Sequence, residues 1–370
     1  MLPRYWRALA VHPPGSLGLL GRVRRVARRL LWASLALAPL TLVAQRVFAI
    51  GDTALFVLAA VALVPLAWLI GESTEHAAEH TGPGVGGFLN ASFGNAPELI
   101  IATFAIADGL PDVVRGSITG SVVSNILLVF GLAIVVGGKG ELDRRSLWSQ
   151  LGIVFGACVL LLVPSIPSWH GNPDRHSLAL VTLPVAVVLL AIYLTVTVQN
   201  LRTHRQAHRD AAAEGSWSLR VSLVVLGVAT LATVFMSEAL VHSLEHFAEA
   251  AGLTQFFISA VIVAIVGNAA EHGGAVVIAR RGKMKLASEI AISSSAQVAV
   301  FVAPAVALLS WIVQPELPLG LRPVELATIA GAAAFVAFVI RDGRTKRWEG
   351  VVLLAVYGAV AVAYGVSGDR

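Results

Sequence analysis

Two long stretches of the sequence are copies of one another. GNAPELIIATFAIADGLPDVVRGSITGSVVSNILL (94–128) aligns without a gap with GNAAEHGGAVVIARRGKMKLASEIAISSSAQVAVF (267–301), at an offset of 173 residues. The identical pairs include Gly94 and Gly267, Asn95 and Asn268, Ala96 and Ala269, Glu98 and Glu271, Gly109 and Gly282, and Ser121 and Ser294. Upstream, EHAAE (75–79) matches EHFAE (245–249). The chain is therefore built from two homologous halves.

The composition around these stretches excludes a water-soluble fold. The 370 residues are 56% hydrophobic and 13% charged, with a mean hydropathy of +0.79, whereas a soluble domain carries roughly 25% charged residues. Apolar runs of about 20 residues, the length that spans a bilayer as a helix, recur along the chain. They predict an all-α polytopic membrane protein with about 11 transmembrane helices. The expected spans are 31–50, 53–71, 85–107, 117–137, 147–166, 177–198, 219–243, 253–280, 287–311, 322–341 and 349–366.

The polar segments divide the chain into five parts. Residues 1–30 form a basic cytoplasmic tail with seven arginines and no acid. Its leucines and valines would form the apolar face of an amphipathic helix on an anionic leaflet, and a tail that only fixes orientation is the other interpretation. The remaining parts are the first transmembrane helix (31–50), a repeat holding spans 2–6 (51–198), a cytoplasmic linker (199–218) and a repeat holding spans 7–11 (219–370).

The positive charges predict the orientation of the chain. Most of the 27 lysines and arginines lie in the tail, the linker and the connections at 139–145, 280–285 and 341–347, which all fall on one side of this topology. The positive-inside rule therefore places the N-terminus in the cytoplasm and the C-terminus outside. This distribution also explains the net charge of +5 without a nucleic-acid partner.

Five spans in each repeat, an odd number, make the second copy enter the membrane from the opposite side. Inverted repeats of this kind belong to secondary transporters, whose sites lie near the midplane at discontinuous helices. Gly94 with Pro97 in the first motif, and Gly267 with Asn268 in the second, predict such breaks. The expected fold is thus one N-terminal helix followed by two inverted five-helix repeats.

Each motif offers oxygen ligands on one helix face. Asn95 and Glu98 are three residues apart, as are Asn268 and Glu271. Two carboxylates with several neutral oxygens suit Ca²⁺, and also Mn²⁺, better than zinc or copper. The predicted cation- and proton-binding residues are Glu98, Glu271, Asn95, Asn268, Ser121, Ser124, Ser294 and Gln297, with Asn125 beside Ser124. No other cofactor is expected.

The same two carboxylates predict coupling to protons. Acidic side chains inside a membrane are energetically costly, so their presence indicates a function. Burial and mutual repulsion favour protonation of the two carboxylates when no cation is bound. Ca²⁺ and protons would then compete for one site. If the empty, charged site resists the switch between inward- and outward-facing states, the protein is an obligate exchanger. The alternative is a structural role for Glu98 and Glu271 in a buried hydrogen-bond network.

At these residues the sequence resembles the cation/proton exchanger (CAX-type) branch of the calcium/cation antiporter superfamily. The resemblance covers most of the chain beyond residue 50. The motifs that carry it are GGFLNASFGNAPELIIATFA (86–105), GSVVSNILLVFG (120–131), SEALVHSLEHFAEAAGL (237–253) and VGNAAEH (266–272). It implies a first helix with two inverted five-helix repeats, Glu98 and Glu271 as the central carriers, and Ca²⁺ transport driven by inward proton flow.

Two departures from the wider superfamily are informative. The sodium/calcium branch typically carries Thr-Ser after the motif glycine, where this chain has Asn-Ala, which favours protons as the coupling ion. The second repeat commonly has Gly-Ser-Ser where this chain has Ser293, Ser294 and Ser295. A glycine is therefore replaced at Ser293, which changes the expected helix packing there.

Further acids and a histidine are candidates for proton or gating roles. His272 follows Glu271 and could pass protons, or could donate one structural hydrogen bond. The acids lie near the expected mouths of the pathway: Glu75 and Glu79 on one side, and Glu238, Glu245 and Glu249 on the other.

Three alternatives to Ca²⁺/proton exchange remain at this stage. A monovalent cation (Na⁺ or K⁺)/proton antiporter would use the same oxygen ligands, although two carboxylates balance one divalent ion better. An intramembrane metalloenzyme would use Glu75, His76, Glu79 and His80, and a passive channel would lack proton coupling. The short loops favour the cell (inner) membrane of a prokaryote, and a homo-oligomer is compatible with the sequence.

Overall fold

The structure, a computed structural model, describes residues 29–48, 50–170, 174–204 and 217–367. The predicted basic tail lies almost entirely outside the described residues. The elements of the first half are α3 (Leu37–Phe48), α4 (Asp52–Gly94), α5 (Ala96–Ala107), α6 (Pro111–Val123), η1 (Ser124–Val129), α7 (Phe130–Gly137), β1 (Gly140–Glu141), α8 (Arg144–Trp169) and α9 (Arg175–His204).

The second half repeats this order of long and broken helices. Its elements are α10 (Leu219–Ala251), α11 (Gln255–Ile258), η2 (Ser259–Val263), α12 (Ala264–Gly267), α13 (Ala269–Arg280), α14 (Met284–Gln297), η3 (Val298–Val302), α15 (Ala303–Val313), α16 (Pro323–Val339), η4 (Ile340–Asp342), β2 (Arg344–Thr345) and α17 (Arg347–Ser367). The segments η1, η2 and η3 are π-helical and η4 is a 3₁₀ turn.

The helices confirm a polytopic membrane protein. Among the described residues, nine helices are long and apolar enough to cross a bilayer, and ten spans result if the bent pair Gln255–Gly267 and Ala269–Arg280 is one. The remaining predicted span, 85–107, is divided between the end of α4 and α5. With 12 residues, α5 is too short to cross a bilayer alone. The predicted number of about eleven therefore differs only where the two matched motifs break.

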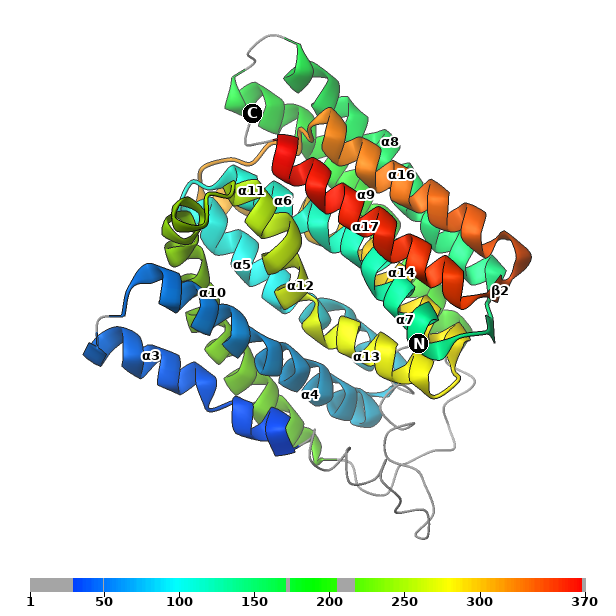
Figure 1. Ribbon diagram of the computed structural model, residues 1–370, viewed down its shortest axis with the longest axis horizontal. Helices are drawn as coiled ribbons and strands as arrows, with labels where there is room; N and C mark the ends of the chain where they lie inside the picture. The colour runs from blue at the N-terminus through cyan, green and yellow to red at the C-terminus, as the bar shows by residue number, and fades with distance from the viewer. Residues whose placement is uncertain (1–28, 49, 171–173, 205–216, 368–370) are drawn as a thin grey trace.

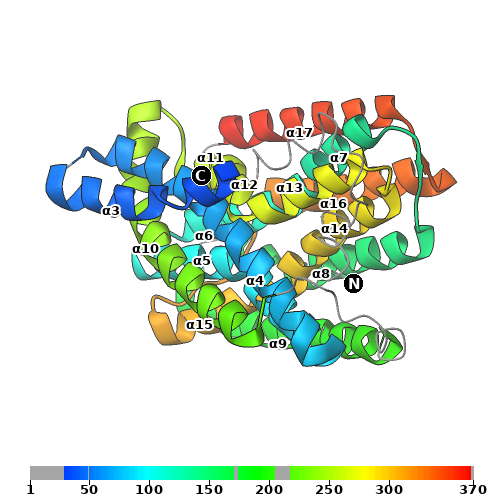
Figure 2. The ribbon, with the colours of Figure 1, turned by 90° about the horizontal axis from the view of Figure 1, so that it is seen from below.

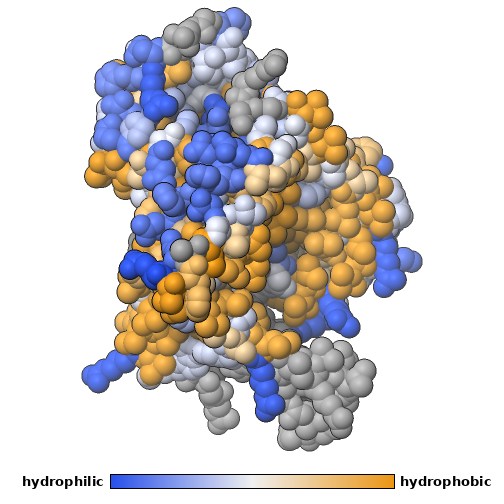
Figure 3. Space-filling view, turned by 60° about the vertical axis from the view of Figure 1, so that its left-hand side comes forward, coloured by the Kyte–Doolittle hydropathy of each residue, from blue (hydrophilic) through white to orange (hydrophobic). Residues whose placement is uncertain are grey.

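The outer surface of the bundle is apolar, as a lipid-facing surface requires. Large side chains at helical spacing are exposed on α8, including Val159 and Val163, and on α10, including Val224, Val228 and Leu231. Figure 3 shows such apolar side chains covering broad areas of one face. Because water would not tolerate so much exposed hydrocarbon, these faces fit a bilayer.

The helices form two groups with the matched motifs between them. α3, α4 and α10 lie together on one side, and α8, α16 and α17 on the other (Figure 1). Figure 2 shows α4 and α10 side by side in a second view, and Phe56 of α4 stacks on Phe247 of α10 with ring centroids 4.2 Å apart. α5, α6 and α11 to α13 run between the groups.

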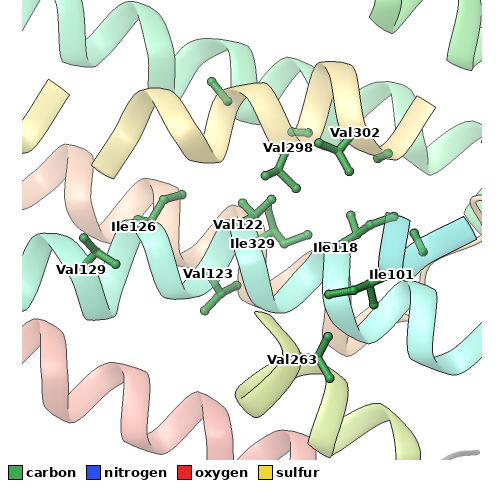
Figure 4. Close-up of a cluster of buried hydrophobic side chains, with 14 of the residues drawn as sticks. Ile101, Ile118, Val122, Val123, Ile126, Val129, Val263, Val298, Val302 and Ile329 are labelled. Carbon is green, nitrogen blue, oxygen red and sulfur yellow. The ribbon is translucent and has the colours of Figure 1, made fainter. Parts of the chain in front are cut away.

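α6 and α14, which lie in the second part of the two matched stretches, cross at the centre of the molecule. The Ser295 hydroxyl donates to the carbonyl of Val122 at 3.1 Å, and these two residues occupy matched positions in the two repeats. Figure 4 shows Ile118 and Val122 of α6 facing Val298 and Val302 of η3. When a two-fold axis relates two repeats, matched residues meet only near that axis, so this contact fits a pseudo-two-fold that passes through the crossing.

Candidate functional site

The two matched motifs break their helices at the same residue. Between α4 and α5 the backbone of Asn95 has φ −98° and ψ 13°, and between α12 and α13 that of Asn268 has φ −91° and ψ 17°. The axes of the second pair differ by 61°. Each break starts a new helix, whose first turn holds Glu98 or Glu271. Negative charge is favoured in the first turn of a helix, because the free amide groups there carry partial positive charge.

The two glutamates reach across to the opposite repeat. A Cβ placed on Gly267 would lie 3.4 Å from Oε1 of Glu98, and a Cβ on Gly94 would lie 3.7 Å from Oε1 of Glu271. The two contacts are equivalent, because the pseudo-two-fold relates one to the other. The glycines thus let each carboxylate approach the backbone of the other motif, and the two acids meet between the repeats.

Neither carboxylate is fully satisfied by the described residues. Glu98 is 3% exposed, and Glu271 is partly buried. One oxygen of each, Oε2, is buried without a hydrogen-bond partner among the described residues. Buried carboxylate oxygens are costly unless they have a partner. Two such oxygens in one place are therefore available to a cation or to protons.

Amide and hydroxyl groups of the two repeats hydrogen bond to one another at the two breaks. Asn95 Nδ2 donates to Gln297 Oε1 at 3.3 Å, and Asn268 Nδ2 donates to Ser121 Oγ at 2.8 Å. Each bond joins the broken helix of one repeat to the helix after the break in the other. The structure therefore links four of the predicted residues across the two repeats, at the breaks that precede Glu98 and Glu271.

Asn125 makes three side-chain hydrogen bonds, all of them to residues of the other repeat. Its Nδ2 donates to Asn268 Oδ1 at 3.1 Å and to Ser294 Oγ at 3.0 Å. Its Oδ1 accepts from His272 Nε2 at 3.1 Å. The histidine therefore fixes the orientation of an amide that joins the two repeats. The position that matches Asn125 is Val298, so the comparison of the repeats does not indicate Asn125, and its helical spacing from Ser121 is what predicted it.

The other predicted residues lie at varying distances from this cluster. Ser124 is buried and donates to the carbonyl of its own Ser121 at 3.3 Å. Glu75 is buried on α4, and Glu79 lies 3.8 Å from His76. Glu238, Glu245 and Glu249 are exposed on α10.

The metalloenzyme interpretation lacks a geometric basis in the part of the chain that the structure describes. No group of three or more His, Cys, Asp or Glu side chains there could hold a metal ion. His76 instead stacks on Trp217, with ring centroids 4.7 Å apart, and His80 Nε2 donates to the Trp217 carbonyl at 2.6 Å. These histidines fasten the start of α10 to α4.

Replacing Asn125 by alanine should destabilise the protein by about 1–3 kcal/mol, because Asn268, Ser294 and His272 would each lose a buried partner. Denaturant unfolding of the purified protein measures this. A double-mutant cycle with Asn268→Ala should show a coupling energy above about 0.5 kcal/mol. Strict additivity of the two changes would show that the network does not act as a unit.

Comparison with known proteins agrees with this geometry. The sequence profile of the family described as sodium/calcium exchanger protein matches residues 52–201 and 221–365. The Ca²⁺/H⁺ antiporter ChaA of Bacillus subtilis (strain 168) is 36% identical over 323 residues, which cover 84% of this chain and 91% of that one. The vacuolar calcium ion transporter of Schizosaccharomyces pombe is 34% identical over 324 residues, covering 84% and 78%.

A solved structure extends the comparison to the fold. The structure of native YfkE superposes with a TM-score of 0.79 at 31% sequence identity, covering 91% of this chain and 99% of that one. The similarity therefore includes both halves of the chain.

Proposed function

The chain belongs to the sodium/calcium exchanger protein family, and on that premise we propose that it exchanges Ca²⁺ for protons across a membrane by alternating access. The observation that carries this proposal is the meeting of Glu98 and Glu271 between the repeats, with an Oε2 of each left without a partner among the described residues. The chain is a secondary transporter and not an enzyme.

Charge balance favours a divalent cation at this site. Two carboxylates neutralise one Ca²⁺, whose flexible shell accepts amide and hydroxyl oxygens such as those of Asn95, Ser121 and Gln297. The roles of Asn268, Ser294 and Ser124 as further ligands are part of this proposal. Mn²⁺, which accepts similar oxygen ligands, is a second substrate in the same proposal.

The same balance supplies the coupling. Protons can replace Ca²⁺ by neutralising the two carboxylates, and the site then carries no net charge in either loaded state. The empty site is doubly negative, and moving it through a low-dielectric region is costly. Binding of either substrate therefore permits the conformational switch, and the empty protein resists it. This makes the exchange obligatory.

Protons rather than sodium are proposed as the coupling ion. The motif reads Asn-Ala after Gly94 and again after Gly267, without the hydroxyl pair of the sodium/calcium branch. The B. subtilis relative also bears the name of a Ca²⁺/H⁺ antiporter. We place the protein in the cell membrane of a prokaryote, with the N-terminus in the cytoplasm, since most lysines and arginines then lie inside.

The test uses proteoliposomes that contain the purified protein and a trapped pH dye. A proton gradient is imposed, and Ca²⁺, Mn²⁺, Na⁺ and K⁺ are added in turn. Ca²⁺ should collapse the gradient and Na⁺ and K⁺ should not. A response to Na⁺ or K⁺ alone would assign a monovalent cation/proton antiporter, and no response to any ion would reject proton coupling.

A further inference from the structure

α6 and α14 occupy matched places in the two repeats, and two positions that hold glycine in α6 hold other residues in α14. In α6, Gly116 and Gly120 pack against the backbone of α11 and η2: a Cβ on Gly116 would lie 2.7 Å from the carbonyl oxygen of Phe256, and one on Gly120 would lie 2.1 Å from that of Ala260. In α14 the matched residues are Glu289 and Ser293. Side chains thus stand where the other repeat has none, so α14 cannot repeat this close backbone contact.

Glu289 is buried without full satisfaction. It is 8% exposed, and its Oε1 has no hydrogen-bond partner among the described residues. A lipid-facing or tightly packed position would not hold such a group, since a buried carboxylate requires a counter-charge or a donor. The position therefore needs a partner beyond the described side chains.

The nearest cation on the same helix is already neutralised. Lys285 Nζ lies 2.8 Å from Oδ2 of Asp143, which precedes α8. The hydrogen bond from Lys285 holds the pKa of the Asp143 carboxyl below its ordinary value, so this acid stays ionised and balances the ammonium group. Lys285 acts on Glu289 only through its charge, because its ammonium group hydrogen bonds to Asp143, and no ion pair of the described residues includes Glu289.

Glu289 also lies on a polar line that leads to the proposed exchange site. Lys285, Glu289, Ser293 and Gln297 follow one another at four-residue steps, which places them on one face of α14, about 6 Å apart along the axis. The line starts at the exposed Lys285 and ends at Gln297, which accepts from Asn95. Ser293 donates to the Ile290 carbonyl and keeps its lone pairs for a ligand.

We propose that Glu289, with the Ser293 hydroxyl, forms a second cation-binding site at the entrance beside the start of α14, which holds Ca²⁺ before it reaches Glu98 and Glu271. This entrance is the cytoplasmic one in the proposed orientation. The inference rests on the proposed function, because it assumes that Ca²⁺ moves along this path. The first repeat has no such site, since glycine occupies the matched position.

Sided transport measurements test this site. Glu289→Gln should raise the KM for Ca²⁺ supplied from the α14 entrance about fivefold, since the carboxylate concentrates cations there. The KM from the opposite side and the maximal rate should change by less than about twofold. Glu289→Asp should keep most of the wild-type KM. Glu141→Gln, which removes an exposed acid of β1, is the control for general surface charge.

The proposal would be overturned if wild type and Glu289→Gln had the same KM for Ca²⁺. It would also be overturned if Glu289→Gln raised the KM equally from both sides, or if Glu141→Gln raised it as much as Glu289→Gln does. Mn²⁺ binding, followed by electron paramagnetic resonance, separates this failure from that of the proposed function. The Glu98→Gln/Glu271→Gln protein should still bind Mn²⁺ weakly, and adding Glu289→Gln should remove that binding. Weak binding that survives the triple change would also reject the site.

Discussion

Glu271→Gln will abolish Ca²⁺-driven proton movement in proteoliposomes. The amide keeps the size of the side chain but removes one of the two negative charges, so a divalent ion is left unbalanced in a buried site. Removing one partner of a buried charge pair costs about 2–5 kcal/mol, so we expect at least a ~30-fold loss of the exchange rate at fixed Ca²⁺.

Glu98→Gln should produce a similar loss, because the pseudo-two-fold gives Glu98 and Glu271 the same contact with the opposite glycine. Glu141→Gln provides the matched control, since it makes the same chemical change on an exposed acid. Exchange at the wild-type rate in either site variant would show that this carboxylate is structural. A loss in only one of them would show that the two repeats contribute unequally.

Gly120→Ala will prevent the accumulation of folded protein. The added Cβ would lie 2.1 Å from the carbonyl oxygen of Ala260 and 2.6 Å from its carbonyl carbon and Cα, all of them backbone atoms. No side chain can rotate away, so α6 and η2 must separate. Overpacking of this severity costs about 3 kcal/mol or more.

The yield of monodisperse protein in size-exclusion chromatography measures this effect, together with the thermal unfolding of whatever protein is recovered. Gly227→Ala is the control, because no atom lies within 4 Å of a Cβ at that position of α10. It should be neutral or slightly stabilising, since alanine favours a helix over glycine. Equal yields from the two variants would contradict the close contact between α6 and η2.

The sequence was sufficient to predict most of the fold. Apolar length alone located the membrane helices, and the gapless alignment of the two motifs indicated the repeats. Hydropathy alone merges the end of α4 with α5 into one run, 85–107, because Asn95 is a single polar residue in an apolar stretch. The break at Asn95 was indicated instead by Gly94 and Pro97. The domain boundaries stay a prediction.

Comparison of the two repeats predicted Glu98 and Glu271, and helical spacing predicted Asn125, whose counterpart is Val298. Glu289 was missed, because its counterpart is Gly116. A residue that only one repeat carries is not found by comparing the repeats. The acids of α10, Glu238, Glu245 and Glu249, are exposed in the structure, and their gating role stays a prediction.

The π-helical segments could not have been predicted either. η1 directly follows Val123, and η3 directly follows Gln297, so both occur where the two site helices leave the centre. A π turn shifts the hydrogen-bond register by one residue and is common at functional sites. No residue type specifies it, because packing of the whole bundle decides where the extra residue is accommodated.

The short ribbon of β1 and β2 restricts how the molecule can move. Gly140 pairs with Thr345 and Glu141 with Arg344, and the Thr345 hydroxyl donates to the Gly138 carbonyl at 2.8 Å. The connection from α7 to α8 is thereby tied to the connection from α16 to α17. The ribbon therefore joins α7, α8, α16 and α17 at one end. When the site opens first to one side of the membrane and then to the other, we expect these four helices to move together as one body. The relative displacement then falls on the helices that the ribbon does not join.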